Sequence, residues 1–312
     1  MKRRIAFFLI VSVLLSGCAG QGDNPNSDTA VTFTDDLGRE VTVDNPQRVA
    51  ALLGSFADVW VLAGGTLCAA AEDAWEDFAL ELPDAVNIGG AHSPSLEQLL
   101  SADPDLVLAS STTASNLDFK DTLEAAGIAV AYFDVKHFDD YLRMLDICTA
   151  ITGRRDLYEQ NGLQIQTQIE DIKAQYAADN VPEEQRKVLL IRAAASVIKA
   201  KGSTGTILGE MLADMGCINI ADSDRTLLEN LSVEAVIQQQ PYHIFVVTMG
   251  SNSEAAKASL EAMLMENPAW STLDAIRAGR IHYMDKTLFN LKPNANWAQS
   301  YQKLYETLIE GS

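Results

Sequence analysis

The sequence predicts an α/β protein with two related lobes and one stiff helix between them. A capped helix followed by a buried strand at residues 95–110 recurs at residues 232–247. Between the two copies, residues 153–178 carry apolar side chains at helical spacing. Short apolar runs that end in glycine or polar loops recur along the chain, as they do in buried strands of parallel sheets.

The repeated unit has the same chemistry in both copies. Ser95 is suited to cap a helix, Gln98 completes a capping box, and a proline ends the helix before the strand. The second copy repeats the serine, the glutamate and the proline at a constant offset of 137 residues, as from Ser95 to Ser232. Solenoid units recur at roughly 20–50 residues, so this repeat predicts two lobes instead. Each copy places one glutamate, Glu97 or Glu234, in the first helical turn.

The apolar stripe predicts a connecting helix over residues 153–180. Its side chains step by four and three residues from Tyr158 through Ile165, Ile169 and Ile172 to Tyr176. A helix of some 26 residues is about 39 Å long at 1.5 Å per residue, long enough to cross a domain. The alternative, an ordinary core helix of one lobe, fits this length less well.

The other elements follow from local patterns. A turn-forming glycine followed by alternation predicts a hairpin around residues 36–43, and the loop 54–56 is expected after the first buried strand. Further strands are expected at 49–53, 86–88, 128–133, 187–191 and 281–284, and helices at 58–63, 121–127, 207–215 and 297–309.

The first 30 residues resemble a bacterial lipoprotein signal and linker. Lys2-Arg3-Arg4 precedes an apolar run over 5–15, which is shorter than the ~20 residues that a membrane span needs. Leu15-Ser16-Gly17-Cys18 matches the lipoprotein box, so the resemblance implies a signal peptide over 1–17 and lipid modification of Cys18. Residues 18–30 are polar and predict a flexible linker. We therefore expect an extracytoplasmic protein anchored to the membrane by its lipid.

Charge and cysteine content narrow the class further. The formal charge of −20 becomes −23 without Lys2, Arg3 and Arg4, which argues against nucleic acid or anionic lipid as partners. Cys68, Cys148 and Cys217 contain no CxxC pair. One disulfide among them is compatible with the compartment, but buried free thiols are the default expectation.

Recognisable catalytic signatures are missing from the sequence. The four histidines are scattered, without the i, i+4 spacing of a helical metal site. The chain has no GxGxxG, GxSxG or ordered phosphate-loop motif. The sequence therefore favours a binding protein over an enzyme.

An ordered series of motifs resembles the iron-complex and cobalamin periplasmic-binding family, from Phe33 to the C-terminus. These proteins are substrate-binding lipoproteins of ABC importers for siderophores, haem and corrinoids. The motifs are Asp35-x-x-Gly38-Arg39-x-Val41-x-Val43, Ile88-Gly89, Ser-x-Glu in both repeats, Pro-Asp-Leu-Val at 104–107, Gly216-x-Ile218-Asn219-Ile220 and Asn267-Pro268-x-Trp270.

The resemblance implies the class III substrate-binding fold. In it, two Rossmann-like lobes, here 31–152 and 181–312, are joined by a single long backbone helix with the ligand between them. The implied partners are a metal chelate (ferric siderophore, haem or corrinoid) as cargo and a permease dimer with ATPase subunits. No intrinsic cofactor, no nucleic acid and a monomer are expected.

The resemblance also assigns a role to the repeated glutamates. In the family, one glutamate per lobe docks on arginines of the permease, and the matching positions are Glu97 and Glu234. The alternative is a purely local role, because a glutamate in a first turn stabilises the helix dipole by roughly 0.3–1 kcal/mol. A local role alone does not require the same residue in both lobes.

The ligand-binding candidates lie in loops expected at strand carboxyl ends. Arg192, Lys199 and Lys292 indicate an anionic ligand in so acidic a chain, and Phe56 and Phe289 are placed to stack on a flat macrocycle. Tyr132 and His137 are candidates for ligating the iron of haem. The full set is Ser55, Phe56, Ser111, Thr112, Lys136, His137, Arg192, Lys199, Met249, Phe289 and Lys292.

Two alternative functions remain open at this stage. A carrier of free Zn²⁺ or Mn²⁺ has the same two-lobe design, but requires convergent histidines and carboxylates. An extracytoplasmic enzyme on paired lobes is the other, because a fold does not fix function.

Overall fold

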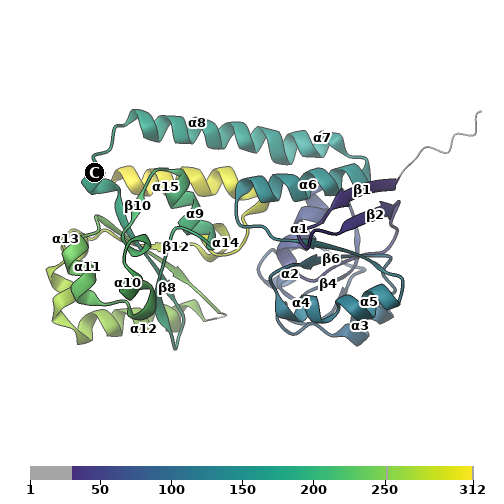
Figure 1. The fold of residues 1–312 in the computed structure, drawn as a ribbon, viewed down its shortest axis with the longest axis horizontal. Helices are drawn as coiled ribbons and strands as arrows, with labels where there is room; N and C mark the ends of the chain where they lie inside the picture. Colours follow the sequence, from purple (N-terminus) through teal and green to yellow (C-terminus); the bar gives the residue numbers. More distant parts are fainter. Residues whose placement is uncertain (1–29, 251, 311–312) are drawn as a thin grey trace, which may run out of the picture.

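The computed structural model describes residues 30–250 and 252–310, which form two α/β lobes side by side, bridged by helices along one edge (Figure 1). The predicted signal peptide, Cys18 and the linker up to residue 29 lie outside these residues. Within the described ranges, no helix combines the length and the apolar character that crossing a bilayer requires.

The N-terminal lobe is built on a five-stranded parallel sheet in the order β5-β4-β3-β6-β7. Numbered within the lobe this is 3-2-1-4-5, an order of doubly wound α/β folds. The predicted hairpin is formed by β1 (Ala30–Thr34) and β2 (Glu40–Asp44), which pair in antiparallel register. The sheet strands are β3 (Val49–Ala51), β4 (Leu67–Ala70), β5 (Val86–Asn87), β6 (Leu106–Ser110) and β7 (Ala129–Phe133).

Helices cover both faces of this sheet. Residues 54–56 belong to the first of them, so the predicted loop after the first strand is wrong. Helix α1 begins at Gly54, where a side chain does not fit, because a Cβ there would lie 2.5 Å from the backbone nitrogen of Ala74. The helices are α1 (Gly54–Leu62), α2 (Asp73–Glu76), α3 (Leu96–Ser101), α4 (Ala114–Asp118), α5 (Lys120–Ala125) and α6 (Phe138–Thr152).

Both copies of the repeat fold as capped helices followed by strands. Ser95 Oγ accepts a hydrogen bond from the Gln98 backbone N–H at 3.3 Å, and Ser232 Oγ accepts one from that of Ala235 at 3.3 Å. The capping box is not formed, because the Ser95 N–H donates to the carbonyl of Ile88 at 2.7 Å.

The segment between the lobes is helical from Arg155 to Ala178, but in three pieces. α7 (Arg155–Tyr158) passes through a π-helical segment, η1 (Glu159–Leu163), into α8 (Gln164–Ala178). Ile165, Ile169 and Ile172 on the predicted stripe are buried. α15 (Trp297–Glu310) lies beside α8 and runs in the same direction (Figure 1), with Gln175 Nε2 donating to Tyr305 Oη at 2.9 Å. The bridge is thus a pair of helices along most of its length.

The C-terminal lobe has a parallel sheet in the order β10-β8-β11-β12, with β9 antiparallel to β8. Its strands are β8 (Lys187–Ala193), β9 (Ile198–Lys201), β10 (Ile218–Asn219), β11 (His243–Thr248) and β12 (Ile281–Met284). Its helices are α9 (Ile207–Asp214), α10 (Arg225–Asn230), α11 (Val233–Gln239), α12 (Ser253–Glu266), α13 (Asp274–Arg277) and α14 (Lys286–Phe289), with 3₁₀ turns at η2 (Glu183–Arg186), η3 (Ile220–Asp222), η4 (Pro268–Thr272) and η5 (Asn294–Asn296).

The three cysteines of the described residues are free thiols. Cys148 is fully buried, and burial raises its pKa to about 12. Burial likewise raises the pKa of Cys217 to about 12. All three are free, as expected, but only Cys148 is buried, whereas Cys68 and Cys217 retain some exposed surface.

Candidate functional site

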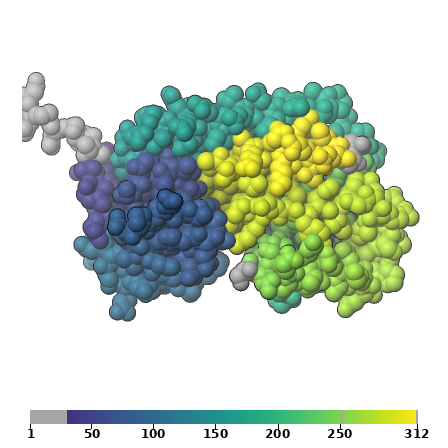
Figure 2. Space-filling model, turned by 180° about the vertical axis from the view of Figure 1, so that it is seen from behind, coloured from purple at the N-terminus to yellow at the C-terminus, as the bar shows by residue number. Residues whose placement is uncertain are grey.

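The site is set by the points where the strand order reverses in each sheet. In the N-terminal lobe this point lies between β3 and β6, and in the C-terminal lobe between β8 and β11. Ligands of open α/β sheets bind outside the carboxyl ends of strands at such points. A hollow separates the two lobes on the side away from α8 (Figure 2). Ser111 follows β6, while Arg192 and Met249 lie at the ends of β8 and β11.

Three cations share one face of the β8–β9 pair. Arg192 lies directly opposite Lys199 in the strand register, and Leu190 lies opposite Lys201. Because side chains alternate along a strand, Arg192, Lys199 and Lys201 project from the same face. No carboxylate of the described residues forms an ion pair with any of them. We call these three residues the cation row.

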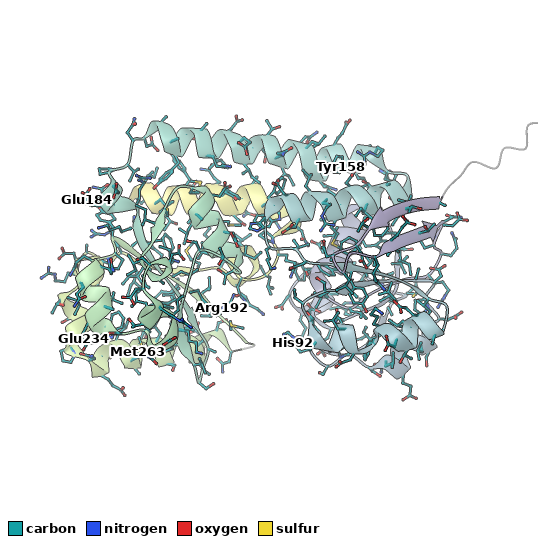
Figure 3. The ribbon with its side chains drawn as sticks, in the orientation of Figure 1. His92, Tyr158, Glu184, Arg192, Glu234 and Met263 are labelled. Atoms are coloured by element: carbon teal, nitrogen blue, oxygen red, sulfur yellow. The ribbon has the colours of Figure 1, made fainter. Side chains whose placement is uncertain are left out.

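Arg192 is the least solvated member of the cation row. Its side chain is half-buried and lies on the part of its lobe nearest the N-terminal lobe (Figure 3). Its buried Nε has no hydrogen-bond partner among the described residues, and burial lowers the guanidinium pKa. Burial first, and then repulsion by Arg192 and Lys199, lowers the pKa of Lys201. A partly desolvated, uncompensated positive charge is costly unless a ligand supplies the counter-charge.

Lys201 was missed by the sequence analysis. Two lysines separated by one residue, Lys199 and Lys201, share a face on any strand, so the signal was present. It was not recognised because β9 was not predicted as a strand.

The remaining cleft candidates are neutral and partly accessible. Ser111 is half-buried, and its N–H donates to the Phe133 carbonyl at 3.0 Å. Thr112 is exposed, and its hydroxyl lies 3.2 Å from that of Ser110. Met249 is 40% exposed beyond β11. Ser111 and Thr112 thus carry hydroxyls just beyond β6, and Met249 carries a thioether just beyond β11.

Lys292 lies where the chain crosses back between the lobes. Its ammonium is 5.6 Å from the centre of the Phe56 ring. Burial lowers the Lys292 pKa, against the opposing attraction of Asp134 and Asp73. Asp73 is itself a buried acid in this region. Burial raises its pKa, and its Oδ1 has no hydrogen-bond partner in the described chain. Within the described residues, no carboxylate forms an ion pair with Lys292, so the attraction of Asp134 and Asp73 only partly offsets the effect of burial.

The predicted stacking residues are not available to a ligand. Phe56 and Phe289 are 0% and 1% exposed and belong to the core between the sheets and the bridging helices. Phe56 packs edge-on against Phe133 at a ring-centre distance of 6.1 Å. Ser55 is also buried on α1, and its carbonyl accepts from Asn294 Nδ2 at 2.8 Å. The expectation that these three side chains face the ligand is wrong for this structure.

The residues considered for haem ligation do not meet in the hollow. Tyr132 is fully buried, its hydroxyl donates to the Asn116 carbonyl at 3.2 Å, and burial raises its pKa to about 12. His137 instead lines a cavity of about 360 Å³ beneath α8, with its Nδ1 3.5 Å from Glu210 Oε2. The ammonium of Lys136 pairs with Asp134. Across the described residues, no cluster of three or more potential metal ligands is present.

A salt bridge joins the lobes at their facing edges. Lys286 Nζ of α14 lies 2.8 and 3.0 Å from the two carboxylate oxygens of Asp77. Asn294 adds a second link, with Nδ2 donating to Asp58 Oδ2 at 2.8 Å. No local sequence pattern predicts these contacts, because their partners are more than 200 residues apart. They fix the two walls of the hollow relative to each other.

Glu97 and Glu234 are both exposed, on short helices. α3 lies on the side of its lobe away from α8 (Figure 1), and Glu234 lies on that side of the other lobe (Figure 3). Neither carboxylate has an ion-pair partner among the described residues, although Ser232 Oγ donates to Glu234 at 3.0 Å. Both carboxylates are therefore accessible to a cationic side chain of another protein.

A buried histidine pair lies at the other end of the C-terminal sheet, remote from the hollow. His243 Nδ1 is 2.9 Å from His282 Nε2, and His243 is fully buried. Burial, then repulsion by His282 and Arg280, lowers the pKa of His243 to about 4. Burial also lowers the pKa of His282.

We expect this pair to make the fold sensitive to acid. A histidine of the unfolded chain has a pKa near 6.5, so above that pH both states are neutral and the fold has its full stability. As the pH falls toward 4, the unfolded chain takes up protons that the buried pair does not, and the free energy of unfolding decreases. For His243 the loss is about 3 kcal/mol by pH 4. Thermal unfolding between pH 7 and 4 measures it. His282→Gln should reduce the pH dependence, because it removes one histidine and its repulsion of His243, although the burial of His243 remains. His92→Gln, at an exposed site, should leave the pH dependence unchanged, and a flat wild-type profile would contradict the assignment.

Two α/β lobes with facing strand ends, a polar hollow and a helical bridge define a two-lobed binding protein of class III architecture. A family model described as periplasmic binding protein matches residues 49–288, and the chain belongs to this family. Members of the family are substrate-binding proteins of transport systems, found outside the cytoplasm.

Individual relatives are similar to this protein over nearly the whole chain. The Fe(3+)-citrate-binding protein YfmC of Bacillus subtilis is 23% identical over 90% of this chain and 88% of its own. YhfQ of the same organism, provisionally named an ABC transporter substrate-binding lipoprotein, is 22% identical over 94% and 93%. The structure of Staphylococcus aureus SirA complexed with staphyloferrin B is similar with a TM-score of 0.68 at 21% identity, covering 90% of this chain and 98% of that one.

Proposed function

We propose that this protein captures an anionic metal chelate between its lobes and delivers it to an ABC permease. The observation that carries the proposal is the cation row, which has no carboxylate partner in the described residues. The chain as a whole has a formal charge of −20, so a cluster of three uncompensated cations is locally distinct. An anionic ligand supplies the counter-charge and replaces the hydration that Arg192 has lost.

The side chains on the two sides of the hollow indicate the class of cargo that fits between the lobes. The C-terminal wall pairs with carboxylate, catecholate or similar oxygen anions through the cation row, and Met249 adds an apolar contact. The N-terminal wall offers the hydroxyls of Ser111 and Thr112 to neutral donors and acceptors. A ferric chelate with carboxylate groups fits this division, and the name of YfmC, an Fe(3+)-citrate-binding protein, agrees with it. The metal is carried inside its chelator, with no catalysis on it.

Delivery rests on the paired glutamates and on the lipid anchor. Glu97 and Glu234 are exposed, one per lobe, and they bind arginines of the permease dimer, whose ATPase subunits drive uptake. Cys18, as the lipid-modified N-terminus, holds the monomer at the outer face of the membrane through the linker 18–30. The lobes are taken as 31–152 and 181–312, with 153–180 as the connection.

Titration with chelates of different charge tests the proposal. Tryptophan fluorescence is followed during addition of ferric citrate, a ferric tris-catecholate, haem and cyanocobalamin. We expect an anionic ferric chelate to bind most tightly, with an affinity that falls as salt is raised. Tighter binding of neutral cyanocobalamin than of every anionic chelate would overturn the proposal.

A further inference from the structure

An aliphatic side chain follows each exposed glutamate by three residues. Leu100 follows Glu97 on α3, and Ile237 follows Glu234 on α11. The two aliphatic residues are separated by the same 137 positions as the glutamates. Leu99 and Val236, their neighbours, are fully buried and anchor the helices on the cores, whereas Leu100 is 37% exposed.

Spacing and accessibility place each aliphatic group beside its carboxylate. Residues three apart on a helix are neighbours, with Cβ atoms roughly 5–6 Å apart. Ile237 is partly buried against the second core cluster but retains accessible surface. Each helix therefore presents a carboxylate that has no ion-pair partner in the described chain and, one turn away, an accessible aliphatic surface.

This combination matches one side chain better than others. Arginine carries a planar guanidinium that forms bidentate pairs with carboxylates, on a stem of three methylenes that packs on apolar surface. Lysine lacks the fork, and a purely apolar partner leaves the carboxylate unpaired. The net negative charge of the chain also attracts a cationic partner to both positions.

We propose that each lobe holds a permease arginine in a two-part cradle, Glu97 with Leu100 and Glu234 with Ile237. The carboxylate pairs with the guanidinium, and the aliphatic side chain packs on the arginine stem. The inference rests on the proposed docking function and adds an apolar half to each contact. The cradles act together because the same pair occurs once in each lobe.

The test separates the two halves of the cradle. The full-length lipoprotein is titrated onto the permease–ATPase complex in nanodiscs, recognised as the complex whose ATP hydrolysis the wild-type protein stimulates. We expect L100Q/I237Q to raise the half-maximal concentration roughly tenfold, since apolar contact with the stems is lost. L100M/I237M, which keeps apolar surface, should behave as wild type.

Two comparisons make the result decisive. V61Q/I218Q changes two side chains of similar exposure, 37% and 39%, outside the cradles, and should have no effect. If E97Q/E234Q abolishes stimulation while L100Q/I237Q matches V61Q/I218Q, the cradle is overturned and glutamate docking stands. If E97Q/E234Q also behaves as wild type, the docking proposal itself fails. The single variant L100Q is the readout if Ile237→Gln lowers the thermal stability of its lobe.

Discussion

Replacing Arg192 by glutamine should weaken binding of an anionic ferric chelate by roughly 10- to 100-fold. A hydrogen bond to a charged group contributes about 1.5–3 kcal/mol, and 1.4 kcal/mol corresponds to a tenfold change in affinity. Arg192 meets this condition because it is half-buried and unpaired in the described chain. Isothermal titration with ferric citrate, or with the tightest chelate of the panel, measures the loss.

Matched variants separate a local contact from overall charge. Lys187→Gln removes one positive charge at the opposite end of the same strand and should leave the affinity unchanged. Arg192→Lys should recover part of the binding, because the charge remains while the fork is lost. Thermal stability of Arg192→Gln should not fall, since no internal partner is lost. Equal affinities of Arg192→Gln and wild type would remove the cation row from the site.

Charge reversal at both glutamates, Glu97→Lys with Glu234→Lys, should reduce transport to background while chelate affinity stays unchanged. Two charge-assisted pairs become two repulsive contacts, which weakens docking by at least roughly 100-fold. Uptake of radiolabelled iron in cells, together with titration of the purified variant, measures both properties.

The chain offers a control of the same chemistry. Glu40 and Glu184 are exposed, one associated with each lobe, and Glu184 lies beside the end of the helical bridge instead of near Glu234 (Figure 3). Their double reversal changes the charge by the same amount and should leave uptake intact. Undiminished transport by the Glu97/Glu234 variant would refute the docking role.

The sequence predicted those parts of the fold that depend on local or repeated patterns. The 137-residue repeat led to two α/β lobes, and both serine caps form as expected. Buried apolar stripes are also local, so Ile165 and Ile169 were placed correctly. The π-helical segment was not foreseen from the sequence. Within it, Gly162 packs so closely that a Cβ there would lie 2.7 Å from the side chain of Leu142, a contact that no local pattern predicts.

The site was predicted less well because exposure depends on contacts distant in sequence. Arg192 and Lys199 were selected as candidates because cations near predicted loops are conspicuous in an acidic chain. Phe56 and Phe289 were misplaced because a loop at a strand end and a helix that starts there have similar sequences. Burial of these rings comes from packing between the lobes and the bridge, which no local pattern encodes.

A crystal structure of the protein loaded with its chelate tests this binding mode most directly. We expect density for the chelate in the hollow between the lobes, with anionic oxygens of the chelator within hydrogen-bond distance of the Arg192 guanidinium. A chelate bound in the cavity beneath α8, or in the hollow with its charged groups turned away from the cation row, would contradict it.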